Sequence, residues 1–270
     1  MTEARKKRPG MHPGHTMSPV LGALTAQLPT ATGPFLGAIR PAGVPSFRSR
    51  RHCVRLSIPV GARTLELARG QVVMLLLDDS GSMFRPETDL EGLRYTAAES
   101  VVDLLRRIGV SSLGIVHWGS SCPEDLLLRP TTPNDVRRVD KALRMPESSL
   151  GGTNLAAALQ FAQSVVQEDT PNLAPDYLVI TDGLESLGKR LEDALADLPP
   201  RCVRLLLVDR AGRCDIAAER AWRNLPLGAF IRLDADDSDD WAWAAAVALF
   251  SEIETPYPEL PHLTAREYLR

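Results

Sequence analysis

Residues 71–83, QVVMLLLDDSGSM, decide the fold. The first seven form an almost unbroken run of valine, methionine and leucine, which is typical of a central strand buried on both faces of a parallel sheet. Polar residues begin at Asp78, directly where this strand is expected to end. Ligands of such sheets bind at the carboxyl ends of the strands. We therefore expect a buried strand that carries polar side chains to a binding edge.

The segments that follow alternate between short apolar runs and longer stretches of helical periodicity. Helical spacing is clearest before Gly109, where the apolar positions are Leu90, Leu93, Ala97, Val101, Leu104, Leu105 and Ile108. The pattern predicts further strands at residues 113–118, 125–128 (a short edge strand), 177–180, 203–208 and 229–233. It predicts further helices at residues 134–143, capped by Asn134, and at 153–166, 191–198, 215–224 and 238–250. This alternation predicts a doubly wound α/β fold, with a mainly parallel sheet and helices on both faces.

Charge divides the chain into two regions. Residues 1–70 hold 11 Lys or Arg residues against Glu3 and Glu66, whereas the remaining 200 residues hold 20 against 32 Asp or Glu residues. Residues 1–51 are also rich in Pro, Gly, Ser and Thr without periodicity, so we predict a disordered basic leader there. A basic arm can bind nucleic acid. A solvated tail explains this composition without a partner, however, and we expect no nucleic-acid partner.

The sequence pattern also predicts where the other regions of the chain begin and end. Residues 52–70 are expected to form an N-terminal strand or hairpin extension, because alternate residues from Val54 onward are apolar and residues 64–67 can pair with them. Residues 71–253 are expected to form the main domain. Residues 254–270, with three prolines, are expected to be an irregular C-terminal tail.

The sequence favours a cytoplasmic location. The four cysteines lie far apart, without the paired spacing of a zinc site or a dense disulfide framework. The basic N-terminal residues are followed by Pro9 and Gly10 rather than by an apolar run, unlike those of a signal peptide. Every apolar run is far shorter than the roughly 20 residues that span a bilayer. We therefore expect reduced thiols and no membrane segment.

Three separate stretches place oxygen-bearing side chains at the expected binding edge. The turn after the first strand carries an aspartate and two serines at alternate positions, loosened by Gly81, so that three side chains can converge. The strand predicted at 177–180 runs into another aspartate at the same edge, and a glycine pair brings a threonine to the start of a helix. Two carboxylates and three hydroxyls suit Mg²⁺, Mn²⁺ or Ca²⁺ and serve zinc poorly. The predicted ligands are Asp78, Ser80, Ser82, Thr153 and Asp182.

These residues resemble the von Willebrand factor type A domain family, whose metal-ion-dependent adhesion site pairs a D-x-S-x-S motif with a distant Thr and a distant Asp. The resemblance covers roughly residues 71–250. It rests on three pieces in the family's order, which are the Asp-x-Ser-x-Ser turn, the Gly-Gly-Thr-Asn segment and the Thr-Asp-Gly turn. It implies a Rossmann-like sheet with one antiparallel edge strand, and Mg²⁺ or Mn²⁺ at the five predicted ligands.

The resemblance also implies a function. Such domains use the cation to bind an acidic residue of another protein, so we expect a metal-ion-dependent interaction module without catalysis. Intracellular bacterial members often work beside AAA+ ATPases, and the resemblance therefore implies a place in such an assembly.

Other interpretations stay open at this point. Asp and Ser also cap helices and turns, although capping explains the three stretches together less well than a shared cation does. A phosphatase of the haloacid-dehalogenase type also places an Asp after its first strand, but it requires a second Asp where this chain has Ser80. A scaffolding domain with a vacant site is the third alternative.

Neighbouring residues receive structural roles. By strand-like alternation we expect Asp79 to face away from the ligands, either behind the site or at the surface. The aspartates within residues 234–240 are expected to stabilise the start of the helix that follows. Packing roles are predicted for His117, Trp118, Trp222, Trp241 and Trp243.

Overall fold

The computed structural model describes residues 53–56, 62–183, 186–210 and 212–250. All of them lie in one compact unit that spans Ala31–Arg270. The leader predicted at residues 1–51 and the tail predicted at residues 254–270 lie outside the described residues. No helix within the described ranges is both long and apolar enough to cross a membrane.

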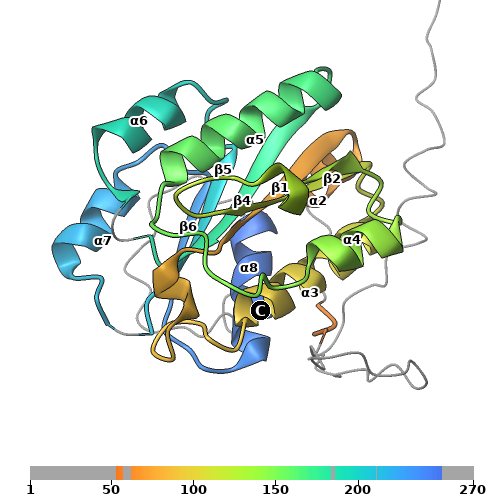
Figure 1. The fold of residues 1–270 in the computed structure, drawn as a ribbon. Helices are drawn as coiled ribbons and strands as arrows, with labels where there is room; N and C mark the ends of the chain where they lie inside the picture. Colours follow the sequence, from red (N-terminus) through yellow and green to blue (C-terminus); the bar gives the residue numbers. More distant parts are fainter. Residues whose placement is uncertain (1–52, 57–61, 184–185, 211, 251–270) are drawn as a thin grey trace, which may run out of the picture. The chain divides into compact units, whose positions relative to one another are not determined.

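Six strands form one sheet in the order β3-β2-β1-β4-β5-β6 (Figure 1). The strands are β1 (Gln71–Asp78), β2 (Ser112–Trp118), β3 (Leu128–Thr131), β4 (Ala174–Thr181), β5 (Val203–Val208) and β6 (Ala229–Leu233). Neighbouring strands are parallel except β2 and β3, which pair antiparallel at one edge. The predicted fold class is therefore confirmed. Because β1 lies between β2 and β4, the strand order reverses at β1, which is where such sheets bind ligands.

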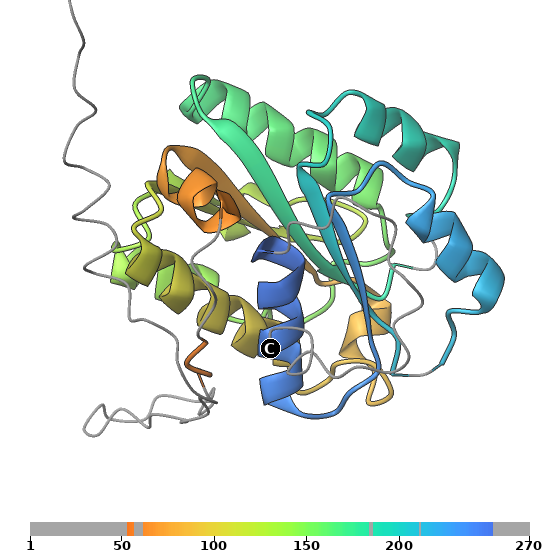
Figure 2. The ribbon, with the colours of Figure 1, turned by 180° about the vertical axis from the view of Figure 1, so that it is seen from behind.

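Helices cover both faces of this sheet (Figures 1 and 2). On one face, α5 (Leu155–Asp169), α6 (Lys189–Ala196) and Trp222 of α7 (Ile216–Arg223) share a core with alternate residues of β1, β4 and β5. On the other face, α3 (Leu93–Ile108) and α8 (Ser238–Phe250) pack side by side, and α4 (Val136–Ala142) contacts the edge strand β3. β1 is buried at every residue after Gln71, as a strand with helices on both faces must be.

Two predicted strands are wrong. The hairpin partner expected at residues 64–67 is part of α2 (Ala62–Ala68), whose Ala, Arg, Leu and Glu content favours a helix and whose buried residues Arg63, Thr64 and Leu67 have helical spacing. The edge strand expected at residues 125–128 begins only at Leu128, because Glu124–Leu126 form the short 3-10 helix η2. Most of the partner strand expected from Val54 onward lies outside the described residues, and residues 53–56 have no regular structure.

Helix starts agree with local capping chemistry at two places and differ at a third. Asn154 accepts the Ala157 N–H at 3.2 Å and so caps α5, and Asp215 caps α7 through the Ala218 N–H at 2.7 Å. The Asn134 cap is wrong, since α4 begins after Asp135, which makes no side-chain cap hydrogen bond. The packing roles of the tryptophans are confirmed, because Trp118, Trp222, Trp241 and Trp243 are all buried.

A candidate cation site at the carboxyl edge of the sheet

Asp78, the last residue of β1, occupies the centre of this edge. Its side chain is fully buried, and its Oδ1 accepts the Ser80 N–H at 2.8 Å. Its Oδ2 accepts a hydrogen bond from the Thr181 hydroxyl. Thr181 ends the neighbouring strand β4, where Leu77 and Ile180 are paired in register, so it lies opposite Asp78. Parallel pairing of β1 and β4 thus brings the Asp-x-Ser-x-Ser turn and the Thr-Asp-Gly turn together.

The turn after β1 also contacts Asp182. The 3-10 helix η1 (Gly81–Phe84) turns the chain immediately after β1 and brings Ser82 back toward the sheet. The hydroxyl oxygens of Ser80 and Ser82 lie 3.1 Å apart, and the Ser82 hydroxyl donates to Asp182 Oδ1 at 2.9 Å. Four of the five predicted ligands are therefore linked by hydrogen bonds.

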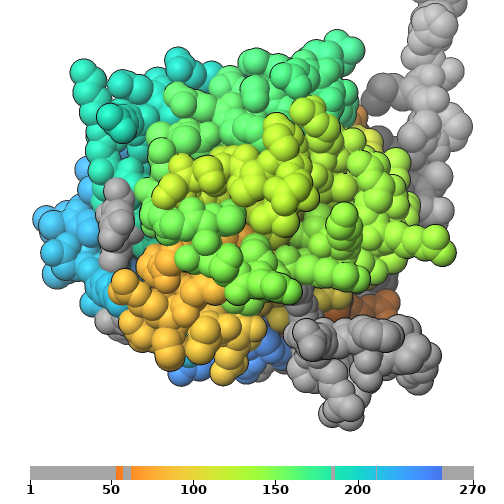
Figure 3. Space-filling model, viewed as in Figure 1, coloured from red at the N-terminus to blue at the C-terminus, as the bar shows by residue number. Residues whose placement is uncertain are grey.

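The loop that carries Thr153 is held against the segments that follow β1 and β2. The Gly81 N–H donates to Gly151 O at 2.7 Å, and the Gly152 N–H donates to the Ser120 hydroxyl at 2.6 Å. Gly151 has a φ of +90°, a backbone conformation that residues other than glycine rarely adopt. The segments around η1 and around Thr153 lie side by side on the surface, drawn orange and green in Figure 3. No hydrogen bond of the described part of the chain joins the Thr153 hydroxyl to the other four residues.

Asp78 differs from the other buried carboxylates in its charge balance. Five aspartates are buried among the described residues, and four of them have an arginine partner. The paired carboxylates are Asp79 and Asp89 with Arg94, Asp176 with Arg63 and Arg204, and Asp209 with Arg232. Asp78 accepts hydrogen bonds from Thr181 and Ser80, and no arginine of the described chain pairs with it.

The environment of Asp78 favours its neutral form. Burial, together with the smaller effect of the nearby charge of Asp182, raises the pKa of Asp78 to about 7 despite the hydrogen bonds from Thr181 and Ser80. A cation at this position would supply the missing positive charge. The donor set is the type that hard cations prefer, because it contains only oxygen atoms. Within the described residues, no group of three or more His, Cys, Asp or Glu side chains is placed to hold a metal, so a site here depends on hydroxyls as well as carboxylates.

Asp79 lies behind the site and is not at the surface. As alternation predicts, its side chain points away from that of Asp78, toward α3. There it accepts hydrogen bonds from Arg94 at 2.7 Å and Tyr95 at 2.6 Å, and it lies 2.7 Å from His117 Nδ1. Burial alone raises the pKa of Asp79, but the hydrogen bond from His117 and the charge of Arg94 hold it below its usual value. His117 packs as predicted and is also part of this polar network.

The predicted ligand set omits two residues that shape the site. Thr181 bonds Asp78 directly, and its place in the Thr-Asp-Gly turn, opposite the end of β1, is the signal that points to it. Ser120 holds the Thr153 loop through Gly152, but a serine after a strand carries no distinguishing pattern.

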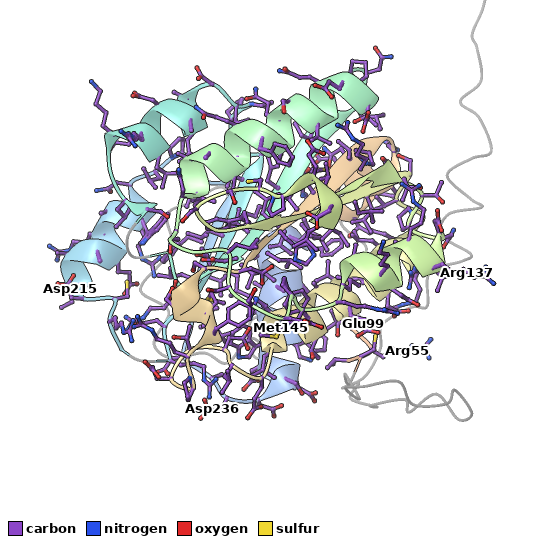
Figure 4. All side chains as sticks on the ribbon, viewed as in Figure 1. Arg55, Glu99, Arg137, Met145, Asp215 and Asp236 are labelled. Atoms are coloured by element: carbon purple, nitrogen blue, oxygen red, sulfur yellow. The ribbon has the colours of Figure 1, made fainter. Side chains whose placement is uncertain are left out.

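The aspartates before α8 surround the start of that helix. Asp237 accepts the Asp239 N–H at 2.9 Å, and Asp239 and Asp240 lie in the first helical turn. Asp236 pairs with Arg210 at 2.5 Å and lies at the lower edge of the view in Figure 4. These contacts fit the stabilisation of a helix start.

The family of the domain follows from comparison with known proteins. Residues 73–185 match the family model described as von Willebrand factor type A domain. These residues, less than half of the chain, are similar to that family. The matched range includes all five predicted ligands, and domains of this family are generally protein-interaction modules.

Solved structures support the same fold. A mutant of the PilB minor pilin from Streptococcus sanguinis has 11% identity and a TM-score of 0.52, and the match covers 67% of this chain and 61% of that chain. The pilus adhesin SpaC from Lactobacillus rhamnosus GG has 14% identity and a TM-score of 0.51, and the match covers 67% of this chain and 30% of that chain.

A third structure, described as von Willebrand factor type A from Catenulispora acidiphila, has 14% identity and a TM-score of 0.46, with 67% of this chain and 42% of that chain covered. The chain thus spans less than two thirds of the length of each of these three proteins. No curated protein sequence matches the chain. The likeness to the PilB and SpaC structures shows the fold alone.

Proposed function

We propose that this domain binds one divalent cation with Asp78, Ser80, Ser82, Thr153 and Asp182, and through the cation binds a carboxylate of a partner protein. The observation that carries the proposal is the charge balance of Asp78, the one fully buried carboxylate of the described chain without an arginine. A buried unpaired charge is costly, and a bound cation removes that cost. Mg²⁺ is the first candidate, and Mn²⁺ or Ca²⁺ suit the same oxygen atoms.

The geometry supports a partner as the further ligand. Mg²⁺ prefers six oxygen ligands and keeps several waters when bound to proteins. Even if all five residues bound directly, one of six positions would remain for water or an incoming carboxylate. One of the proteins of similar fold is a pilus adhesin, which agrees with binding to another protein. Association with an AAA+ ATPase and a cytoplasmic location stay predictions from the sequence.

The phosphatase alternative is not favoured. Its chemistry needs a general acid two residues after the first aspartate, and this position holds Ser80, whose hydroxyl lies 3.1 Å from that of Ser82. We infer that the site binds and does not catalyse. Turnover of p-nitrophenyl phosphate that is lost in Asp78→Asn would contradict this inference.

Partner capture tests the proposed function. The full chain is immobilised and exposed to native lysate in Mg²⁺ or in EDTA, alongside Asp78→Asn and the control Asp193→Asn, an exposed aspartate of α6. We expect a protein that is retained by the wild type and by Asp193→Asn in Mg²⁺ and is released by EDTA. Asp78→Asn should not retain it. A partner held equally well in EDTA and by Asp78→Asn would contradict the proposal.

A further inference from the structure

Arg94 of α3 connects two buried carboxylates directly behind the candidate cation site. One terminal nitrogen donates to Asp79 Oδ1 at 2.7 Å, and the other donates to Asp89 Oδ2 at 2.6 Å. All three side chains are fully buried. Asp89 in turn accepts the Leu93 N–H at 2.5 Å, at the start of α3. The ion pairs thus fix the start of α3 to the residue that follows Asp78.

The same guanidinium contacts both ends of the segment that carries three predicted ligands. Asp79 lies between Asp78 and Ser80, and it is bonded to Arg94. Phe84 ends η1, two residues after Ser82, and its ring centroid lies 5.2 Å from the guanidinium carbon of Arg94. Arg94 therefore holds residues 78–84 at both ends without contacting a predicted ligand through a described hydrogen bond.

Asp79 extends this support to the other loops of the site. Its backbone O accepts the Leu150 N–H at 2.7 Å, where the loop that carries Thr153 begins. Its Oδ2 lies 2.7 Å from His117 Nδ1, and His117 Nε2 lies 2.6 Å from Ala142 O at the end of α4. A shift of Asp79 would therefore move both the segment after β1 and the Thr153 loop.

We propose that Arg94 is a positioning residue for the cation site, which holds residues 78–84 in the shape that a small octahedral cation requires. This inference rests on the proposed function, since it requires that a cation binds. Mg²⁺ demands near-ideal octahedral geometry, whereas Ca²⁺ accepts variable coordination. Partners behind the ligands typically change metal affinity by about 10- to 100-fold when they are removed. Loss of Arg94 should therefore weaken Mg²⁺ binding more than Ca²⁺ binding.

Arg204 offers a matched control for the loss of a buried arginine. It is also buried and pairs with a buried carboxylate, since its Nε donates to Asp176 Oδ1 at 3.2 Å. Arg204 and Asp176 lie near the amino ends of β5 and β4, at the opposite edge of the sheet from Asp78. Arg204→Met should therefore lower stability without changing the cation site.

The experiment measures Mg²⁺ and Ca²⁺ affinity of the full chain by calorimetry, with the metal ion alone as the probe. We expect Arg94→Met to weaken Mg²⁺ binding by about 10- to 100-fold and Ca²⁺ binding by a clearly smaller factor. Arg94→Lys, which keeps one charged donor, should lie between Arg94→Met and the wild type. Arg204→Met should keep both affinities within about twofold of the wild type, although its unfolding temperature falls.

Phe84→Leu keeps every buried charge paired and is used if Arg94→Met does not fold. It removes the ring beside the guanidinium, and it should also lower the ratio of Mg²⁺ to Ca²⁺ affinity. Unchanged Mg²⁺ affinity in Arg94→Met or in Phe84→Leu would overturn the role of Arg94. A loss of Mg²⁺ affinity in Arg204→Met as large as that in Arg94→Met would also overturn it. So would an Arg94→Met variant that loses Mg²⁺ and Ca²⁺ affinity by the same factor. A wild-type chain that binds neither cation would instead refute the proposed function, and the positioning role with it.

Discussion

Ser82 donates a 2.9 Å hydrogen bond to Asp182, a residue 100 positions later in the chain. This contact joins the turn after β1 to the turn after β4, and it exists because these strands are parallel neighbours whose carboxyl ends meet at one edge. It also shows what a cation would change. A metal ion bound to the Ser82 hydroxyl and to Asp182 would add a second link between these two turns.

The first prediction concerns Asp182. Asp182→Asn should weaken Mg²⁺ affinity by at least about tenfold, because a charged oxygen ligand is lost. The free energy of unfolding in EDTA should change by less than about 1 kcal/mol, since Asp182 is only partly buried and its repulsion of Asp78 is relieved. Calorimetry and urea unfolding measure the two quantities. Equal Mg²⁺ affinity in the variant would remove Asp182 from the site.

The second prediction concerns pH in the absence of metal. The pKa of Asp78 is about 7 in the folded protein and near 3.8 when the chain is unfolded, so the folded state holds a proton that the unfolded state has released between these values. The contribution of Asp78 to stability therefore falls as pH rises from about 4 to 7, by up to about 1.4 kcal/mol per pH unit, and is constant above pH 7.

Urea unfolding in EDTA at pH 5.5 and pH 7.5 checks this prediction. The wild type should lose more stability between the two values than Asp78→Asn, which cannot ionise there. Because Mg²⁺ competes with this proton, Mg²⁺ should also raise the unfolding temperature more at pH 7.5 than at pH 5.5. Identical pH dependence in the wild type and Asp78→Asn would show that Asp78 does not titrate in this range.

The third prediction concerns Gly151, in the loop that carries Thr153. Gly151→Ala places a methyl group 2.6 Å from the Ser120 hydroxyl at a residue with φ +90°, so either the loop or the Ser120 hydroxyl that holds Gly152 must move. Gly109→Ala is the control, because Gly109 has φ +79° but no atom within 4 Å of the added methyl group. Both variants should lose roughly 1–2 kcal/mol of stability from backbone strain. Only Gly151→Ala should weaken Mg²⁺ binding, and equal Mg²⁺ affinity in the two variants would contradict the role of this loop.

The fourth prediction concerns a buried cluster that should affect the stability of the fold but not Mg²⁺ affinity. Asp176 binds Arg63 and Arg204 at the far edge of the sheet, and all three are buried. Asp176→Ala leaves two buried arginines without this carboxylate and should lower the free energy of unfolding by about 3–5 kcal/mol. Mg²⁺ affinity of the folded variant should not change. Urea unfolding and calorimetry at a temperature where the variant is folded measure both, and a change in affinity would show that this cluster acts on the site.

Sequence patterns predict most strands of the sheet better than they predict the segment before β1. β5, β6 and α8 have the bounds that the pattern predicts, since each is a mainly apolar segment that contrasts with its flanking residues. The segment around α2 misleads because it is only seven residues long, and so few residues fit both a strand and a helix. β3 contains Pro130, which an edge strand tolerates, so the apolar pattern alone does not locate it.

The sequence predicts a set of candidate ligands, but it does not predict the residues that support them. Alternation along β1 predicts that Asp79 faces away from Asp78, and the structure confirms it. The partners of Asp79 come from α3 and β2, and only the packing of these elements brings Arg94 and His117 to the same carboxylate. Local spacing carries no information on such contacts.

Titration of Mg²⁺ into the full, EDTA-treated chain and into Asp78→Asn tests the central claim most directly. The account predicts one Mg²⁺ bound per wild-type chain at pH 7.5, with binding abolished in Asp78→Asn while the variant keeps its circular dichroism spectrum. A folded wild-type chain that binds no Mg²⁺, or an Asp78→Asn variant that binds it as tightly as the wild type does, would contradict the account.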